Sequence, residues 1–333
     1  MSTVALIAAP VRAPRRSIVS LIAQYSVLIA FVIVVFFFAV SSPTFLTWAN
    51  IQNVLVNNVA LLAVVALGMT LVIASGGIDL SVGASIDMSS MAFIMVMGAG
   101  VSLGIGLLAG LGAAVAVGIV NALLITRLRI SPFLATLGVL FIGQSVQQLA
   151  TDGGQPIYLV GSGAAQSFAF IGHGLVLGVP LPLWIVAVAY GLVYVLLHHT
   201  RFGRYTYALG AQPGVAWYSG LRINRDTAAV YMLGALLSGL TGIMLSATVR
   251  SYVPLSGNAF LLDAIGATFI GTTVSSTHRP SVLGTLLGVL LLGIVRNGLL
   301  LVGWNFYWQQ VGTGVLIFLV LAVSFGTRRL GQQ

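Results

Sequence analysis

The stretch Ser75-Gly76-Gly77-Ile78-Asp79-Leu80-Ser81-Val82-Gly83 is a polar, glycine-containing interruption between two long apolar runs, 59–74 and 84–101. Asp79 is one of only five acidic residues in the chain. A carboxylate beside hydrocarbon is costly unless it faces a cavity, a partner or lipid headgroups. The stretch is therefore both a predicted helix break and a candidate functional site.

The composition of the rest of the chain decides the fold class. It is 59% hydrophobic and 6% charged, with a mean hydropathy of +1.08, which indicates an integral membrane protein. Apolar runs of about 20 residues, without alternating ten-residue strands, favour helices over a barrel. We predict an all-α polytopic membrane protein with about ten spans, at 18–40, 51–74, 83–100, 104–126, 131–150, 181–199, 227–248, 259–273, 281–301 and 306–325.

The basic residues predict the orientation. All 14 are arginines, and placing both termini in the cytoplasm puts 12 of them in cytoplasmic segments. The run after Arg12, Arg15 and Arg16 continues without a small-residue cleavage pattern, so we interpret it as a retained helix and not a signal peptide. The predicted organisation is a cytoplasmic tail at 1–17, a single transmembrane domain at 18–326 and a cytoplasmic tail at 327–333.

Two connections are too long to be simple turns. The predicted outer loop, 151–180, contains no arginine, whereas the predicted cytoplasmic loop, 200–226, contains four. The segment Pro213 to Gly220 is typical of a short helix that begins with proline and ends at glycine. Such a helix can lie on membrane lipid headgroups or dock into a partner.

Two interpretations of the break stay open. Structurally, Gly76 and Gly77 can end one helix in a left-handed conformation, and Asp79 or Ser81 can cap the next. Functionally, a broken helix offers backbone groups and side-chain oxygens to a polar solute. Asp87 would share a helical face with Asp79 if the helix starts by Asp79, so the pair is either a proton or cation coupling site or two locally bonded side chains.

Other polar side chains inside the spans are mostly amides, which suit a neutral polyol better than an ion, although each alone is more often interhelical glue. They are Asn53, Asn57, Asn58, Asn121, Gln144, Gln147, Gln148 and Asn297. Asp263 and Arg296 are candidates for a buried ion pair.

The residues that several kinds of chemistry require are not recognisable in the sequence. With no cysteine and no metal-ligand spacing among the histidines, we predict no metal and no cofactor. Neither a catalytic nucleophile with its base nor a phosphate-binding loop is recognisable, so we predict no catalytic residues, and ATP chemistry would require another chain. Nucleic-acid binding is not expected, because the positive charge of a membrane chain reports its orientation.

Four stretches, taken together, resemble the permease subunits of bacterial ABC importers for monosaccharides, the ribose-permease-like family. They are Ala66–Ala74 leading into Gly76–Gly83, Pro132–Gly138 with Gly154–Ile157, Thr200–Arg204 through Ser219–Leu221, and Leu262–Ile265 through Ser281–Thr285 to Tyr307–Gln310. The chain departs from the family pattern at Gln212, at Val215 and Ala216, at Leu261 and at 277–280.

The resemblance implies a ten-helix permease of the type II importer kind in the bacterial inner membrane, translocating a monosaccharide or related polyol by alternating access. It implies three protein partners: an ATPase subunit with two nucleotide-binding halves, a periplasmic sugar-binding protein, and a second permease copy or close paralogue. It also implies that a cytoplasmic helix transmits the ATPase's motion. The matching candidates are Gly210, Gly214, Ala216, Ser219 and Gly220.

The orientation places the break toward the cytoplasmic end of the pathway, as an inner gate or helix junction. The gate and pathway candidates are Gly76, Gly77, Asp79, Ser81, Asn57, Asn58, Gln144 and Gln147. The alternative function is a stand-alone secondary transporter in which Asp79 and Asp87 couple a proton or sodium ion to the solute. An intramembrane enzyme is the least supported alternative, because no catalytic group is recognisable.

Overall fold

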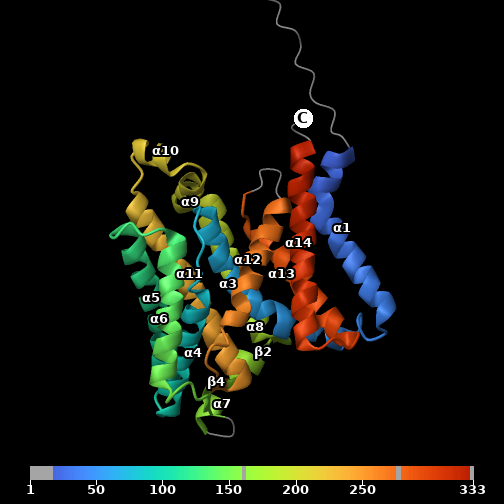
Figure 1. Cartoon of the computed structure of the whole chain (residues 1–333). Helices are drawn as coiled ribbons and strands as arrows, with labels where there is room; N and C mark the ends of the chain where they lie inside the picture. The colour runs from blue at the N-terminus through green and yellow to red at the C-terminus, as the bar shows by residue number, and fades with distance from the viewer. Residues whose placement is uncertain (1–17, 160–162, 275–278, 331–333) are drawn as a thin grey trace, which may run out of the picture.

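The computed structural model describes residues 18–159, 163–274 and 279–330. Long helices stand side by side, with small elements gathered at each end (Figure 1). The predicted tail at 1–17 lies outside the described residues, as do Thr277, His278 and the last three residues of the predicted C-terminal tail. The helix before that tail continues to Leu330, past the predicted boundary at 326.

All ten predicted apolar runs correspond to helices. The helices are α1 (Ile18–Ser41), α2 (Trp48–Asn53) continued by the π-helix η1 (Val54–Val59) and α3 (Ala60–Ala74), α4 (Val82–Gly98), α5 (Leu103–Thr126), α6 (Pro132–Ala150), α8 (Leu181–His199), α11 (Ile223–Val249), α12 (Asn258–Val274), α13 (Val282–Leu301) and α14 (Phe306–Leu330). Within the described residues, six helical stretches are long and apolar enough to cross a membrane, and four further apolar helices are shorter. The polytopic helical prediction is confirmed.

Short elements occupy the two predicted long connections. In the first lie α7 (Gly163–His173) and the strands β1 (Ile157–Tyr158), β2 (Leu175–Val176) and β3 (Val179–Pro180); β1 pairs with β4 (Ser251–Tyr252), and β2 pairs with β3. The all-α prediction is wrong for these strands. The β2–β3 reversal is a two-residue turn in which Leu177 and Gly178 both have positive φ, the geometry that matches the twist of a hairpin.

The second connection forms α9 (Arg201–Ala211) and α10 (Pro213–Tyr218). Both lie at the opposite end of the molecule from α7 and the strands, and α1 begins and α14 ends at the α10 end (Figure 1). The predicted short helix after Pro213 is confirmed, with Pro213 at its first position and Gly220 in a left-handed conformation after its end.

Helix α3 is the centre of the structure. All its residues from Ala60 to Val72 are buried, and it packs against α8, α11, α12 and α13. Helix α11 in turn packs against α4 and α5. A helix that is apolar on every side and enclosed in this way provides the frame for the break that follows it.

Two halves of the chain repeat one pattern in opposite directions. Helix α3 ends beside α9, whereas α11 begins beside α9 and α10. Helices α4 and α12 each have 17 residues, follow an irregular segment and carry an aspartate, Asp87 or Asp263, at the sixth position. The next helices contain Gly118-Ile119-Val120-Asn121 and Gly293-Ile294-Val295-Arg296-Asn297. Inverted repeats of this kind place interrupted helices in the interior of a transporter.

Helices α12 and α13 cross through a seam of small residues. A Cβ atom on Gly288 would clash with the carbonyl oxygen of Ala267, and one on Gly271 would clash with the backbone of Gly284. Close backbone approach of this kind stabilises helix pairs where lipid gives little hydrophobic drive.

Gly288→Val should therefore lower the melting temperature of the purified protein in detergent. Overpacking such a contact costs about 1–3 kcal/mol. The matched control is Gly112→Val in α5, where a Cβ atom meets no atom within 4 Å. Equal melting temperatures for the two variants would contradict the seam.

Candidate functional site

The predicted break is present at residues 75–81, between α3 and α4. Gly76 has a φ of +83° and ends α3 in the predicted left-handed conformation. Gly77 does not share that conformation; instead a Cβ atom there would clash with the hydroxyl of Tyr231 on α11. The two glycines are thus required for different reasons, one for backbone geometry and one for close packing.

Asp79 holds the break by folding back on it. Its Oδ1 atom accepts hydrogen bonds from the Ser81 backbone N–H at 2.8 Å and from the Ser81 hydroxyl at 2.6 Å. The Asn121 side chain on α5 donates to the Ser81 hydroxyl oxygen at 2.6 Å. The capping prediction is wrong: Ser81 stands at the N-cap position of α4, but it makes no side-chain capping bond, because its hydroxyl is engaged by Asp79 and Asn121.

Further contacts connect the break to two more helices. The Leu80 N–H donates to the Thr136 hydroxyl on α6 at 3.1 Å. That hydroxyl has its nearest acceptor in the Pro132 carbonyl at 2.9 Å, and the Ile78 carbonyl lies 3.3 Å away. On the other side, a Cβ atom on Gly210 of α9 would clash with the carbonyl oxygen of Ala74. The break is a junction of α5, α6, α9 and α11, and both Asp79 and Ser81 are buried in it.

Asp87 has partners of its own. Its Oδ1 atom accepts from the Gly257 N–H at 2.7 Å and from the Ser256 hydroxyl at 3.1 Å. The prediction that Asp79 and Asp87 share a helical face is wrong, because α4 begins only at Val82 and Asp79 lies outside the helix. The two carboxylates serve separate polar networks.

A second irregular segment, 250–257, precedes α12 and includes Arg250 and Leu255 at positive φ. Gln147 of α6 is buried, and its Oε1 atom accepts from the Tyr252 hydroxyl at 2.9 Å and the Leu255 N–H at 3.2 Å. Gln144 donates to the Asn258 side chain at 3.3 Å. Both glutamines therefore contact this segment or the start of α12, a placement that sequence reasoning did not predict.

The two irregular segments lead into the first turns of α4 and α12, which lie next to each other. Gly257 packs so closely against the first turn of α4 that a Cβ atom on it would clash with the carbonyl oxygen of Gly83. In the same way, a Cβ atom on Gly83 would lie 2.6 Å from the Asn258 Oδ1 atom. The starts of α4 and α12 are thus in contact. Both helix N-termini, with their free backbone N–H groups, meet in the interior.

Asn57 and Asn58 do not join this region. They lie in η1, where Asn57 is exposed and its side chain donates to Asn53 at 2.6 Å, while Asn58 is half-buried near Gly293 of α13. The structure therefore brings Gly76, Gly77, Asp79 and Ser81 together in one junction and Gln144 and Gln147 at the next, and leaves both asparagines elsewhere.

The predicted pair of Asp263 and Arg296 is confirmed as an ion pair between α12 and α13. It lines a cavity of about 470 Å³. Asn297 points elsewhere and exchanges two hydrogen bonds of 2.9 Å with Asn50.

The coupling candidates differ in exposure. Gly210 is packed against the break, Gly214 has open space around it, and the Ser219 hydroxyl donates to the Val215 carbonyl at 2.9 Å. Ala216 is buried, so a partner cannot touch it directly. The large apolar side chains on the exposed face of α10 are Val215, Trp217 and Tyr218, the last two 63% and 84% exposed, and sequence reasoning missed them. The signal available in the sequence was that two aromatic residues lie between the proline that begins the predicted helix and the glycine that ends it.

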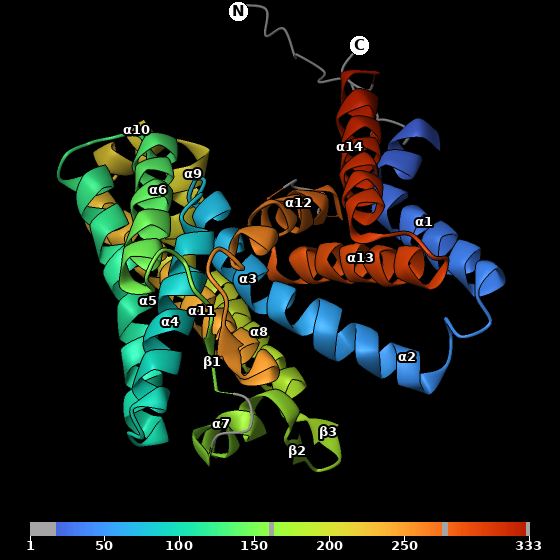
Figure 2. The same ribbon diagram turned by 60° about the horizontal axis from the view of Figure 1, so that its bottom comes forward.

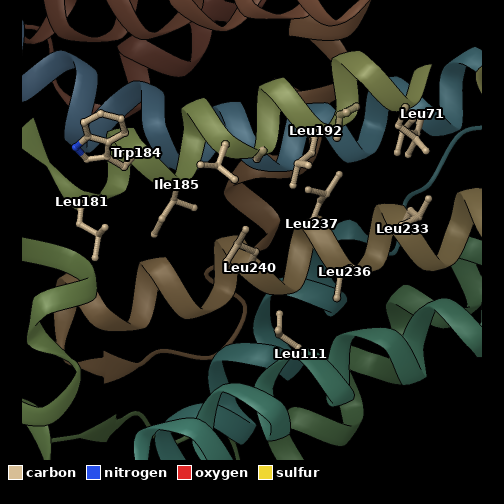
Figure 3. A pocket seen from close by; sticks show the side chains of 14 residues that line it. Leu71, Leu111, Leu181, Trp184, Ile185, Leu192, Leu233, Leu236, Leu237 and Leu240 are labelled. Atoms are coloured by element: carbon tan, nitrogen blue, oxygen red, sulfur yellow. The ribbon is translucent and has the colours of Figure 1, made fainter. Parts of the chain in front are cut away.

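A separate groove of about 610 Å³ lies between α8 and α11. Figure 3 shows its leucines, such as Leu192, Leu233 and Leu237, pointing into it from both helices. Its lining side chains are apolar apart from the Trp184 ring nitrogen, which donates to the Val176 carbonyl at 3.1 Å. The groove has the character of a lipid-facing surface and not of a path for a polar solute.

Interrupted, inverted helical halves whose irregular segments are held by buried polar side chains are typical of a multi-pass membrane permease. The chain belongs to the family described as branched-chain amino acid transport system / permease component, whose model matches residues 50–321.

Individual relatives extend over most of the chain. The ribose import permease protein RbsC of Bacillus subtilis is 37% identical over 292 residues, covering 88% of this chain and 89% of the relative. RbsC of Escherichia coli K12 is 35% identical over 297 residues, covering 89% and 92%. The galactose/methyl galactoside import permease protein MglC of Haemophilus influenzae is 27% identical over 300 residues, covering 85% and 88%. No solved structure matches the chain.

Asp79→Ala should lower the melting temperature of the purified permease, because it leaves two buried donors of Ser81 without their acceptor. Each such loss costs about 1–3 kcal/mol. Asp79→Asn keeps an Oδ1 acceptor and should melt close to the parent protein. An Asp79→Ala variant as stable as the parent would show that the carboxylate does not hold the break.

Proposed function

We propose that this chain is the membrane-spanning subunit of an ATP-binding cassette importer, which moves a monosaccharide or related polyol inward while a partner subunit hydrolyses ATP. The family membership supports a permease, and the relatives named as ribose and galactose import permeases support a sugar. The single observation that carries the proposal is the direct packing of α9 on the break.

The proposed topology has ten crossings with both termini in the cytoplasm of a bacterial cell and the chain in its inner membrane. One end of the molecule carries α9, α10 and the connection between α5 and α6, and α7 lies at the other end (Figure 1). The arginines of these cytoplasmic segments are Arg127, Arg129, Arg201, Arg204, Arg222 and Arg225. Their distribution follows the positive-inside rule.

The exposed face of α10 is the proposed docking surface for the ATPase. Val215, Trp217 and Tyr218 project from a helix that is held on α9 and on the start of α11. Exposed aromatic side chains on a rigid helix are typical anchors of protein interfaces. Two permease copies would present two such helices, one for each nucleotide-binding half of the ATPase.

Helix α9 connects this surface to both halves of the permease. Gly210 packs against Ala74 and Gly76 at the end of α3. The Tyr207 hydroxyl donates to the Pro280 carbonyl, just before α13, at 2.7 Å. Burial raises the pKa of Tyr207 to about 12, so this donor keeps its proton at neutral pH. A displacement of α9 therefore reaches the cytoplasmic ends of both halves, which supports a gating role for the break.

The competing function is a stand-alone proton- or sodium-coupled transporter. The observation in its favour is Asp79, which is buried and has no ion-pair partner among the described residues. Against it, Asp87 is fixed by Gly257 and Ser256, so the two carboxylates do not form one coupling site.

Reconstitution separates the two functions. The chain is placed in proteoliposomes with the ATPase and the sugar-binding protein encoded beside it, and radiolabelled D-ribose and D-galactose uptake is measured. We expect uptake that requires ATP and both partner proteins. Uptake by the isolated chain driven by a proton or sodium gradient would overturn the proposal.

Trp217→Glu/Tyr218→Glu should abolish co-purification of the ATPase without unfolding the permease, because both side chains project away from the protein. The matched control is Leu175→Glu/Leu177→Glu, which adds the same two negative charges at exposed apolar positions on the opposite end. Normal ATPase retention by the double variant would remove α10 as the docking surface.

A further inference from the structure

The cavity beside the Asp263–Arg296 ion pair is lined by residues of α12, α13 and α14. Figure 2 shows α13 and α14 on the side of the molecule away from α5 and α6. The cavity volume of about 470 Å³ is within the usual range for small-molecule sites. The residues that matter for its chemistry are Asn258, Asp263, Arg296, Gln310, Thr313 and Phe318.

The ion pair determines whether this side of the molecule can face lipid. The Arg296 side chain is 27% exposed in the last third of the apolar helix α13, and Gln310, which lines the same cavity, is exposed as well. A guanidinium exposed to hydrocarbon in a membrane segment is costly, so intramembrane arginines face water-filled cavities or partners. The cavity therefore faces either an aqueous path or a partner surface, and not lipid.

The charges also restrict the occupant. Asp263 and Arg296 neutralise each other, so the cavity carries no net charge that would attract an ion. Their remaining capacity is directional: the carboxylate accepts hydrogen bonds, the guanidinium donates them, and the Asn258 and Gln310 amides do both. That combination matches hydroxyl groups, each of which is a donor and an acceptor at once, and Phe269 and Phe318 offer apolar surface to the C–H face of a ring.

We propose that this cavity is the site at which a neutral polyol, such as a monosaccharide, rests inside the membrane during its passage. The proposal rests on the proposed function and adds the location and the recognising groups. Asn258, which lines the cavity, accepts from Gln144 and lies at the start of α12 against the first turn of α4. A solute in the cavity therefore contacts the place where the two interrupted halves meet.

Gly314→Trp tests the cavity by filling it. Gly314 lines the cavity and a Cβ atom there meets nothing within 4 Å, so the indole has room to enter without displacing a helix. ATP-driven uptake of D-ribose and D-galactose by the complete reconstituted importer should fall to about a tenth of the parent rate or less. The control is Gly191→Trp on α8, an exposed position with the same open surroundings outside the cavity. Parent-level uptake by Gly314→Trp would overturn the site.

A second measurement does not depend on transport. The natural chain has no cysteine, so Gln310→Cys creates a single thiol on the cavity wall. D-ribose or D-galactose should slow alkylation of this thiol several-fold and leave a Gly191→Cys thiol unaffected. Equal alkylation rates with and without either sugar would overturn the site, even if Gly314→Trp failed to fold.

The outcomes of these two experiments distinguish a failure of the cavity site from a failure of the proposed function. Sugar protection of the Gln310→Cys thiol without ATP-driven uptake would support the site and reject the ATP-driven mechanism. ATP-driven uptake by the parent, with no protection and no effect of Gly314→Trp, would support the mechanism and reject the site.

A third variant separates solute contact from a purely structural role of the ion pair. In Asp263→Leu/Arg296→Leu no buried charge is left unpaired, so the double variant should fold and assemble with the ATPase. Its uptake should still be lost, because the hydroxyl-binding groups are gone. Retained uptake would show that the pair only holds α12 to α13.

Discussion

A backbone that leaves helical geometry inside a membrane must find its hydrogen-bond partners within the protein, since hydrocarbon supplies none. Both interruptions of this fold meet that constraint in part with buried side chains. At 75–81 the backbone N–H groups donate to Asp79, within the segment, and to Thr136 of α6, and at 250–257 they donate to Gln147 of α6 and Asp87 of α4. These side chains make two irregular segments tolerable at the centre of an otherwise apolar bundle.

The two segments bring the starts of α4 and α12 into contact, so the inverted halves meet at their least regular points. Each half also reaches the end of the molecule that carries α9, through Gly76 and Pro280. The interior junction and the helix pair α9 and α10 are therefore parts of one connected structure. A mostly apolar cavity beside α12, with the Asp263–Arg296 ion pair in its wall, adjoins the same junction through Asn258.

Apolar run length was enough to predict the ten helices, because each run approaches the thickness of a bilayer. The left-handed Gly76, the helix after Pro213 and the Asp263–Arg296 pair also followed from local chemistry. The burial of individual residues did not follow from the sequence. In a membrane protein the lipid-facing and core-facing sides of a helix are both apolar, so periodicity could not show that Asn57 is exposed. The capping role given to Asp79 or Ser81 failed because Asp79 bonds to Ser81, whose hydroxyl is also held by Asn121, forty residues further along the chain.

The central claim is that α9 and the break move as one unit when the ATPase works. Hydrogen–deuterium exchange on the assembled importer, with and without ATP and vanadate, tests it most directly. The account predicts that amide exchange changes together in segments 75–81 and 205–212, which are in backbone contact through Gly76 and Gly210. A change confined to α9 and α10, with 75–81 unaffected, would contradict it.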